Sequence, residues 1–145
     1  MSARENIAID LMTQLENMTD PAPGLVSRKY FDLTKLAITQ FPAILITTTE
    51  EAREDISTDL RQGRIRYNLR CYVRGTELDT LRNEIVERIE ETLETARARN
   101  ITNNAASIHN VTTQVANVEV VERELPLGEV VVGLDVVYRH KKGVM

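Results

Sequence analysis

The sequence predicts an α+β domain: a mainly antiparallel sheet of four to five strands packed against an N-terminal helix and one long central helix. Three patterns support this class. Residues 64–74 alternate strictly between polar and apolar side chains, the spacing of a half-buried strand. From Thr76, apolar residues recur three or four apart, as in an amphipathic helix. Two valine-rich runs, Val115–Glu122 and Glu129–Arg139, flank Leu125–Gly128 and predict a hairpin.

Length and composition predict one domain covering residues 1–145. Its core is built from Val, Ile and Leu, because aromatic residues are few and Trp is absent. The net charge of -4 gives no general argument for nucleic-acid binding. No secretory signal and no apolar run of membrane-spanning length is visible, so we expect no membrane partner and a protein that is intracellular or assembled inside a cell. Cys71 falls on the apolar side of its strand and is expected to be a buried thiol.

The N-terminal third predicts short elements. A helix is expected from Ala3 to about Asn17, where apolar residues keep helical spacing, and the Pro-rich run Asp20–Gly24 ends it. A short strand is expected within Leu25–Tyr30. Asp32 is placed to cap a short helical turn. The β-prone run Phe41–Thr47 then predicts a strand.

Residues 49–62 allow two interpretations. The apolar residues before Gly63 alternate in the even phase, whereas those after it alternate in the odd phase. A one-residue shift at a glycine predicts a β-bulge at that position. The segment is then a protruding arm that contacts another subunit. The alternative is a disordered loop, because the first half of the segment is acidic.

The second half predicts the longest helix and the closing strands. The helix is expected to run from Thr76, which begins a weak capping pattern, to Arg99, after which an Asn-rich stretch ends it. His109 falls in the polar connection that follows. Residues 140–145 are expected to be a flexible basic tail.

The unequal distribution of charge gives the candidate site. The strand after Gly63 carries four arginines and no acid, whereas the helix that follows is mainly acidic. Complementary surfaces of this kind can pair copies of one chain, so we expect a subunit interface. Two alternatives remain open: charges that protect an exposed strand from aggregation, and contacts with phosphate. The predicted interface residues are Arg64, Arg66, Arg70, Arg74, Glu87 and Glu91.

The chain carries no motif of an enzyme. It has no Gly-rich phosphate loop, no Cys-x-x-Cys and no His-x-x-x-His, and its histidines, His109 and His140, have no triad partners at a suggestive spacing. Adjacent acids such as Glu50–Glu51 have no apolar setting that would shift a pKa. We therefore expect no catalytic residues, no metal and no cofactor.

The order of elements resembles the tail terminator, or tail completion, proteins of long-tailed bacteriophages such as phage lambda. The resemblance rests on the N-terminal helix, on the strand Phe41–Ile46, and on the strand Arg64–Arg74 followed at once by the helix. It also includes the closing hairpin at Leu125–Gly128 and the strand end Val136–Arg139. The features cover nearly the whole chain.

This resemblance implies a virion structural protein that is not an enzyme. Such proteins form a hexameric ring that ends polymerisation of the tail tube at its head-proximal end and provides the surface for head attachment. The implied partners are further copies of the chain, the tail tube protein and a head completion or connector protein. DNA passes through the lumen only as cargo. Assembly takes place in the host cytoplasm.

Two other classes remain open. Another head–tail connector or neck protein shares the size and the α+β class. A small ferredoxin-like ligand-binding domain is the more distant alternative, and it requires a concave pocket with convergent polar groups.

Overall fold

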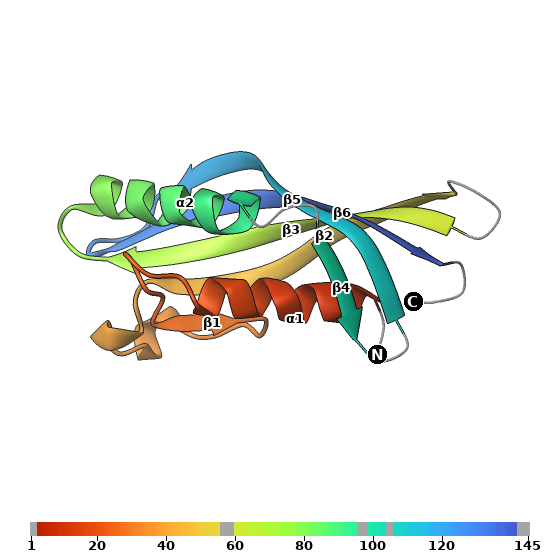
Figure 1. The fold of residues 1–145 in the computed structure, drawn as a ribbon. Coiled ribbons are helices and arrows are strands. Elements are labelled where there is room, and N and C mark those ends of the chain that lie inside the picture. The colour runs from red at the N-terminus through yellow and green to blue at the C-terminus, as the bar shows by residue number, and fades with distance from the viewer. Residues whose placement is uncertain (1–2, 56–59, 96–98, 104–105, 142–145) are drawn as a thin grey trace.

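The computed structural model describes residues 3–55, 60–95, 99–103 and 106–141. Within them, two helices cover one face of a six-stranded sheet of order β1-β2-β3-β6-β5-β4 (Figure 1). β1 is parallel to β2, and the other pairs are antiparallel. The elements are α1 (Ala3–Glu16), β1 (Leu25–Ser27), two 3-10 turns (Leu33–Lys35 and Ile38–Gln40), β2 (Ala43–Asp55), β3 (Leu60–Arg74), α2 (Leu78–Thr95), β4 (Arg99–Asn103), β5 (Ala106–Val121) and β6 (Leu127–Lys141). The predicted α+β class, with an N-terminal and a central helix on a mainly antiparallel sheet, is confirmed.

The main core lies between the sheet and both helices. It contains the odd-numbered apolar residues of β3 and the even-numbered ones of β6, so the alternation in each strand places one apolar face against the helices. The helical stripes of α1 and α2 supply the other side. Each fully buried Leu or Ile side chain contributes about 1.5–3 kcal/mol. The large fully buried side chains of the helices are Leu15, Ile85, Ile89 and Leu93.

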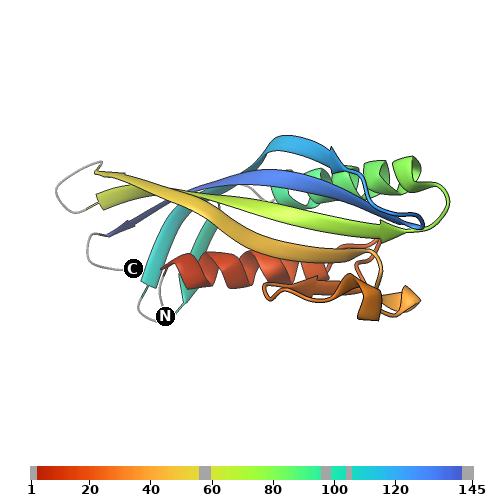
Figure 2. The ribbon, with the colours of Figure 1, turned by 180° about the vertical axis from the view of Figure 1, so that it is seen from behind.

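A second, smaller cluster lies on the opposite face of the sheet. Ala43, Leu45 and Tyr72 are buried there beneath the segment between β1 and β2. The Phe31 ring meets Tyr72 edge-on, with ring centroids 5.8 Å apart. Asp32 caps the first 3-10 turn as expected, because its Oδ1 accepts a hydrogen bond of 3.0 Å from the Thr34 amide. This segment therefore covers one end of a face that the helices leave open; Figure 2 shows the molecule from that side.

The β2–β3 pair contradicts the bulge predicted at Gly63. Gly63 pairs in regular register with Arg53 on one side and Tyr138 on the other. The irregularity lies in β2 instead, between Thr48 and Glu50. Residues 49–55 and 60–62 belong to paired strands, and residues 56–59 lie outside the described part.

Three boundaries differ from the sequence expectations. α2 ends at Thr95, and Arg99–Asn103 form β4, because pairing with β5 satisfies the backbone of a stretch whose polar composition favours a loop. β5 begins at Ala106, so His109 belongs to a strand. β6 continues to Lys141, so the first two residues of the expected tail, His140 and Lys141, pair with β3. Residues 142–145 are not described.

Candidate functional site

The four predicted arginines all lie on the open face of β3. Arg64, Arg66, Arg70 and Arg74 share the strand side opposite the buried Ile65, Leu69 and Val73. β3 pairs with β2 and β6 along both sides, so it is a central strand. The alternative in which these charges protect an exposed strand from aggregation fits the exposed face of β3 but not a strand edge, because this backbone has no free edge over the paired length.

Arg66 is already engaged within the chain. Its Nε donates a hydrogen bond of 3.0 Å to Asp135 Oδ1 on β6, and Glu50 lies opposite it on β2. The hydrogen bond to Asp135 and the negative charges around it raise the pKa of the Arg66 guanidinium. An arginine held in this way is less available to a partner than its position in the sequence indicates.

Arg70 belongs to a three-residue cluster around Glu129. The Glu129 side chain is 0% exposed, although the side chains of Arg70 and Arg123 are 41% and 37% exposed. Arg70 Nη1 lies 3.2 Å from Glu129 Oε2, and Arg123 Nε lies 2.6 Å from Glu129 Oε1. The Arg123 guanidinium also lies 5.2 Å from the centre of the Tyr72 ring. The sequence analysis did not predict this cluster. Its only feature visible in the sequence is that Glu129, a carboxylate, stands at the start of a valine-rich strand.

Arg64 and Arg74 differ from the other two. The cross-strand neighbours of Arg64 are Ala52 and Val137, and Arg74 faces Leu127, so neither has an acid opposite it. Both are exposed, and among the described residues neither forms an ion pair. Of the predicted basic residues, these two are therefore the best placed to meet another molecule.

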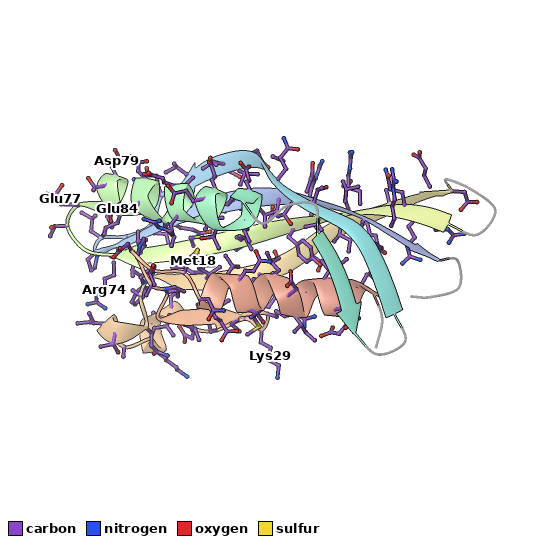
Figure 3. All side chains as sticks on the ribbon, in the orientation of Figure 1. Met18, Lys29, Arg74, Glu77, Asp79 and Glu84 are labelled. Atoms are coloured by element: carbon purple, nitrogen blue, oxygen red, sulfur yellow. The ribbon has the colours of Figure 1, made fainter. Side chains whose placement is uncertain are left out.

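The acidic residues of the candidate site lie on the other side of the molecule. Glu87 and Glu91 are exposed on α2. Arg88 Nη1 donates to Glu91 Oε2 at 2.6 Å, and its Nε donates to the Asp20 carbonyl at 3.1 Å. Further acids, Glu77, Asp79 and Glu84, surround the start of α2 (Figure 3). The basic and acidic patches are thus separate surfaces on opposite faces of the sheet.

An apolar groove lies between α2 and β5. Val118 and Val120 of β5 point to the helix side of the sheet, beside the buried Val130 and Val132 of β6. Yet they stay 45% and 53% exposed, because α2 does not extend over them. The groove is lined by Arg82, Asn83, Val86, Glu87, Glu90, Val118, Val120 and Val130.

One edge of β5 is also free of a strand partner. β4 pairs with β5 only as far as Val111, so within the described chain residues 112–121 have β6 as their single strand neighbour. Glu94 Oε1 accepts a hydrogen bond of 3.0 Å from the Val115 amide. The edge beyond it, from Ala116 to Val121, borders the groove.

The titratable side chains of Cys71 and Tyr67 are buried in the core. Burial raises the pKa of the Cys71 thiol, and the side chain is fully buried as expected. Burial also raises the pKa of Tyr67 to about 12. Glu50 and Glu51 point to opposite faces of β2, since they pair with Arg66 and Ile65 of β3, so they do not form an acid–base pair. Among the described residues, no cluster of His, Cys, Asp and Glu is suited to hold a metal.

Comparison with known proteins gives no family. No protein-family model matches this chain, and no curated protein matches it in sequence. Among the described helices, none is long and apolar enough to cross a bilayer.

Proposed function

We propose that the protein is a structural subunit of a phage tail, a tail terminator, which forms a ring on the head-proximal end of the tail tube. In this role it stops tube polymerisation and offers a surface for head attachment. Its partners are further copies of itself, the tail tube protein and a head completion or connector protein, and DNA passes through the lumen as cargo. It acts through its outer surfaces and has no reaction centre.

The observation that carries this proposal is the difference between the two margins of the sheet. One margin consists of α2 and the free edge of β5, with exposed valines in an acidic setting. The other consists of the short β1 and the segment that joins it to β2 (Figure 1). A ring of identical subunits requires two unlike patches on each subunit, which meet head to tail and close after rotation. Two unlike margins on opposite sides of one sheet meet that requirement.

The β2–β3 hairpin supports a second contact. Its strands continue beyond the helices (Figure 1), and their ends are strongly charged, with Arg61 Nε 3.0 Å from Asp55 Oδ1. A paired, projecting ribbon is suited to reach a neighbouring subunit or the tube.

Electron microscopy of the negatively stained protein, alone and mixed with tail tubes, tests the proposal. Annular particles, or caps at one end of the tubes, are the expected result. A globular monomer in both samples would overturn it.

Complementation separates a terminator from a connector. Cells that produce phage without this protein are expected to contain overlong or unjoined tails. Finished tails beside unstable filled heads would instead assign the protein to the connector class.

A further inference from the structure

The segment from Arg28 to Gln40 presents two apolar side chains to solvent. Tyr30 is 83% exposed and Ile38 is 70% exposed. The segment is anchored on both sides of these residues. Phe31, Leu33, Leu36 and Phe41 pack against the second cluster beneath it.

An ion pair fixes the beginning of the same segment. The Arg28 guanidinium donates two hydrogen bonds to the Glu5 carboxylate of α1, at 2.6 and 2.9 Å. With the Asp32 cap and the buried residues, this pair holds the segment in one conformation. Tyr30 and Ile38 are thus carried on an ordered surface, which lowers the entropy cost of docking them into a partner.

The groove between α2 and β5 has the complementary composition. Its floor is made of valines, and the charged residues that line it are two glutamates, Glu87 and Glu90, and one arginine, Arg82. The whole of α2 has six acidic residues against two arginines. The exposed segment has the opposite balance, with Lys29 and Lys35 against Asp32, while Arg28 is paired with Glu5. An apolar contact surrounded by opposite charges specifies both the fit and the orientation of a partner.

The two surfaces cannot meet within one subunit. They lie at opposite margins of the sheet, since β5 and β1 are separated by β6, β3 and β2. Figure 1 places α2 and β5 along one margin and β1 along the other, and Figure 3 places Lys29 on the side away from Glu84. The same arrangement lets one copy present its segment to the groove of the next.

We propose that the groove between α2 and β5 binds the Arg28–Gln40 segment of a neighbouring copy, with Tyr30 and Ile38 against Val118 and Val120. This inference rests on the proposed function, because it names the contact by which the ring closes. Lys29 and Lys35 of one copy face the acidic rim of the next.

Cross-linking between two different variants tests the contact. Ile38→Cys protein is mixed with Val120→Cys protein and oxidised. Because each chain carries one introduced thiol, and Cys71 is buried, a disulfide between the new thiols joins two chains. We expect a covalent dimer from the mixture. A mixture of Ile9→Cys and Val120→Cys is the matched control, since Ile9 is another exposed apolar residue outside the segment, and no dimer is expected from it.

Charge reversal provides an independent measurement. We expect self-association to weaken about tenfold or more in each of two double variants, Lys29→Glu/Lys35→Glu and Glu87→Lys/Glu90→Lys. Sedimentation equilibrium, which gives the average mass in solution, measures the change. In a mixture of the two variants, both contacts between unlike chains bring opposite charges together, so assemblies in which the two variants alternate are expected to form.

The outcomes separate this inference from the proposed function. Wild-type rings without the Ile38–Val120 cross-link, and unaffected by either charge reversal, overturn the contact and leave the ring intact. Cross-linking of Val120→Cys only to an added tube protein overturns a second copy as the occupant. A wild-type monomer in the presence of tubes overturns both proposals.

Discussion

Glu129 stabilises one end of the open face through two ion pairs. Arg70 and Arg123 are its partners, and each keeps more than a third of its side chain exposed. Removing a buried charge that has two partners leaves both guanidiniums without a partner at this position, although each can still reach water. The cluster is therefore expected to matter more for stability than any of its pairs would alone.

We predict that Glu129→Ala lowers the free energy of unfolding by about 2–3 kcal/mol, less than for a fully buried pair because the arginines are partly solvated. Urea denaturation followed by circular dichroism measures this. Glu119→Ala is the control, because Glu119 is exposed on the neighbouring strand opposite Val131. Equal stability of Glu129→Ala and wild type would show that the cluster contributes nothing.

At the level of secondary-structure elements, Gly63 allows β3 to pack closely against Tyr138 of the neighbouring strand β6. A Cβ atom at this position would lie 2.6 Å from both Cε1 and Oη of Tyr138. The Tyr138 ring is buried over the glycine, and its hydroxyl donates to Glu51 Oε1 at 3.1 Å. The glycine is thus required by an aromatic ring that crosses it, and not by a bulge.

Substituting Gly63→Ala is expected to destabilise the protein by about 1–3 kcal/mol through overpacking. The double variant Gly63→Ala/Tyr138→Leu should lose less than the sum of the two single variants, because the clash disappears with the ring. Thermal and urea unfolding of the four proteins in this cycle give the coupling. Arg64→Ala, next along the strand on the other face, should stay within about 0.5 kcal/mol of wild type. Strict additivity in the cycle would mean that the ring does not restrict position 63.

The elements that local periodicity encodes were predictable. The alternation of β3 placed Cys71 inside and the arginines outside, and the stripe of α2 placed Ile85 and Ile89 in the core. β4 was not predictable, because its polar residues become a strand only through pairing with β5. Such pairing depends on residues of another strand, which the spacing of apolar residues within β4 does not reveal.

The candidate site was predictable only in part, for the same reason. Alternation put Arg66 and Arg70 on one face, but their internal partners, Asp135 and Glu129, lie 69 and 59 residues further along the chain. The groove between α2 and β5 is equally non-local. In the sequence Val118 and Val120 resemble core residues. They are exposed only because α2 does not cover them, and the sequence does not show where α2 lies.

At the scale of the whole molecule, buried protonated groups link stability to alkaline pH. Burial is the main cause that raises the pKa values of Cys71, Tyr138 and Tyr67, the last to about 12 from an ordinary value of 10.0. The unfolded chain releases these protons at lower pH than the folded chain does. Stability is therefore fully present below the unfolded pKa values and is lost as the pH rises through the folded ones.

We expect the urea midpoint to stay level up to about pH 7.5 and to fall above it, because an unfolded thiol with a pKa of about 8.5 begins to ionise there. Between pH 10 and 12 the contribution of Tyr67 amounts to as much as about 1.4 kcal/mol per pH unit. The Tyr67→Phe variant should show a shallower decline over this range. An equally steep decline in this variant would remove Tyr67 as a cause.

The basic open face allows a last prediction, which separates folding from assembly. Reversing Arg66 and Arg70 to Glu places new carboxylates beside Asp135 and Glu129, so this double variant is expected to lose stability as a monomer. Arg64→Glu/Arg74→Glu removes no ion pair that is present among the described residues, so its urea midpoint should match wild type. If the basic face meets a neighbouring copy, Arg64→Glu/Arg74→Glu weakens self-association about tenfold, equivalent to about 1.4 kcal/mol per contact.

Sedimentation at several salt concentrations measures the change, which should shrink as salt screens the exposed charges. Stable, fully assembled Arg64→Glu/Arg74→Glu protein would exclude both arginines from the interface and leave the groove between α2 and β5 as the assembly contact.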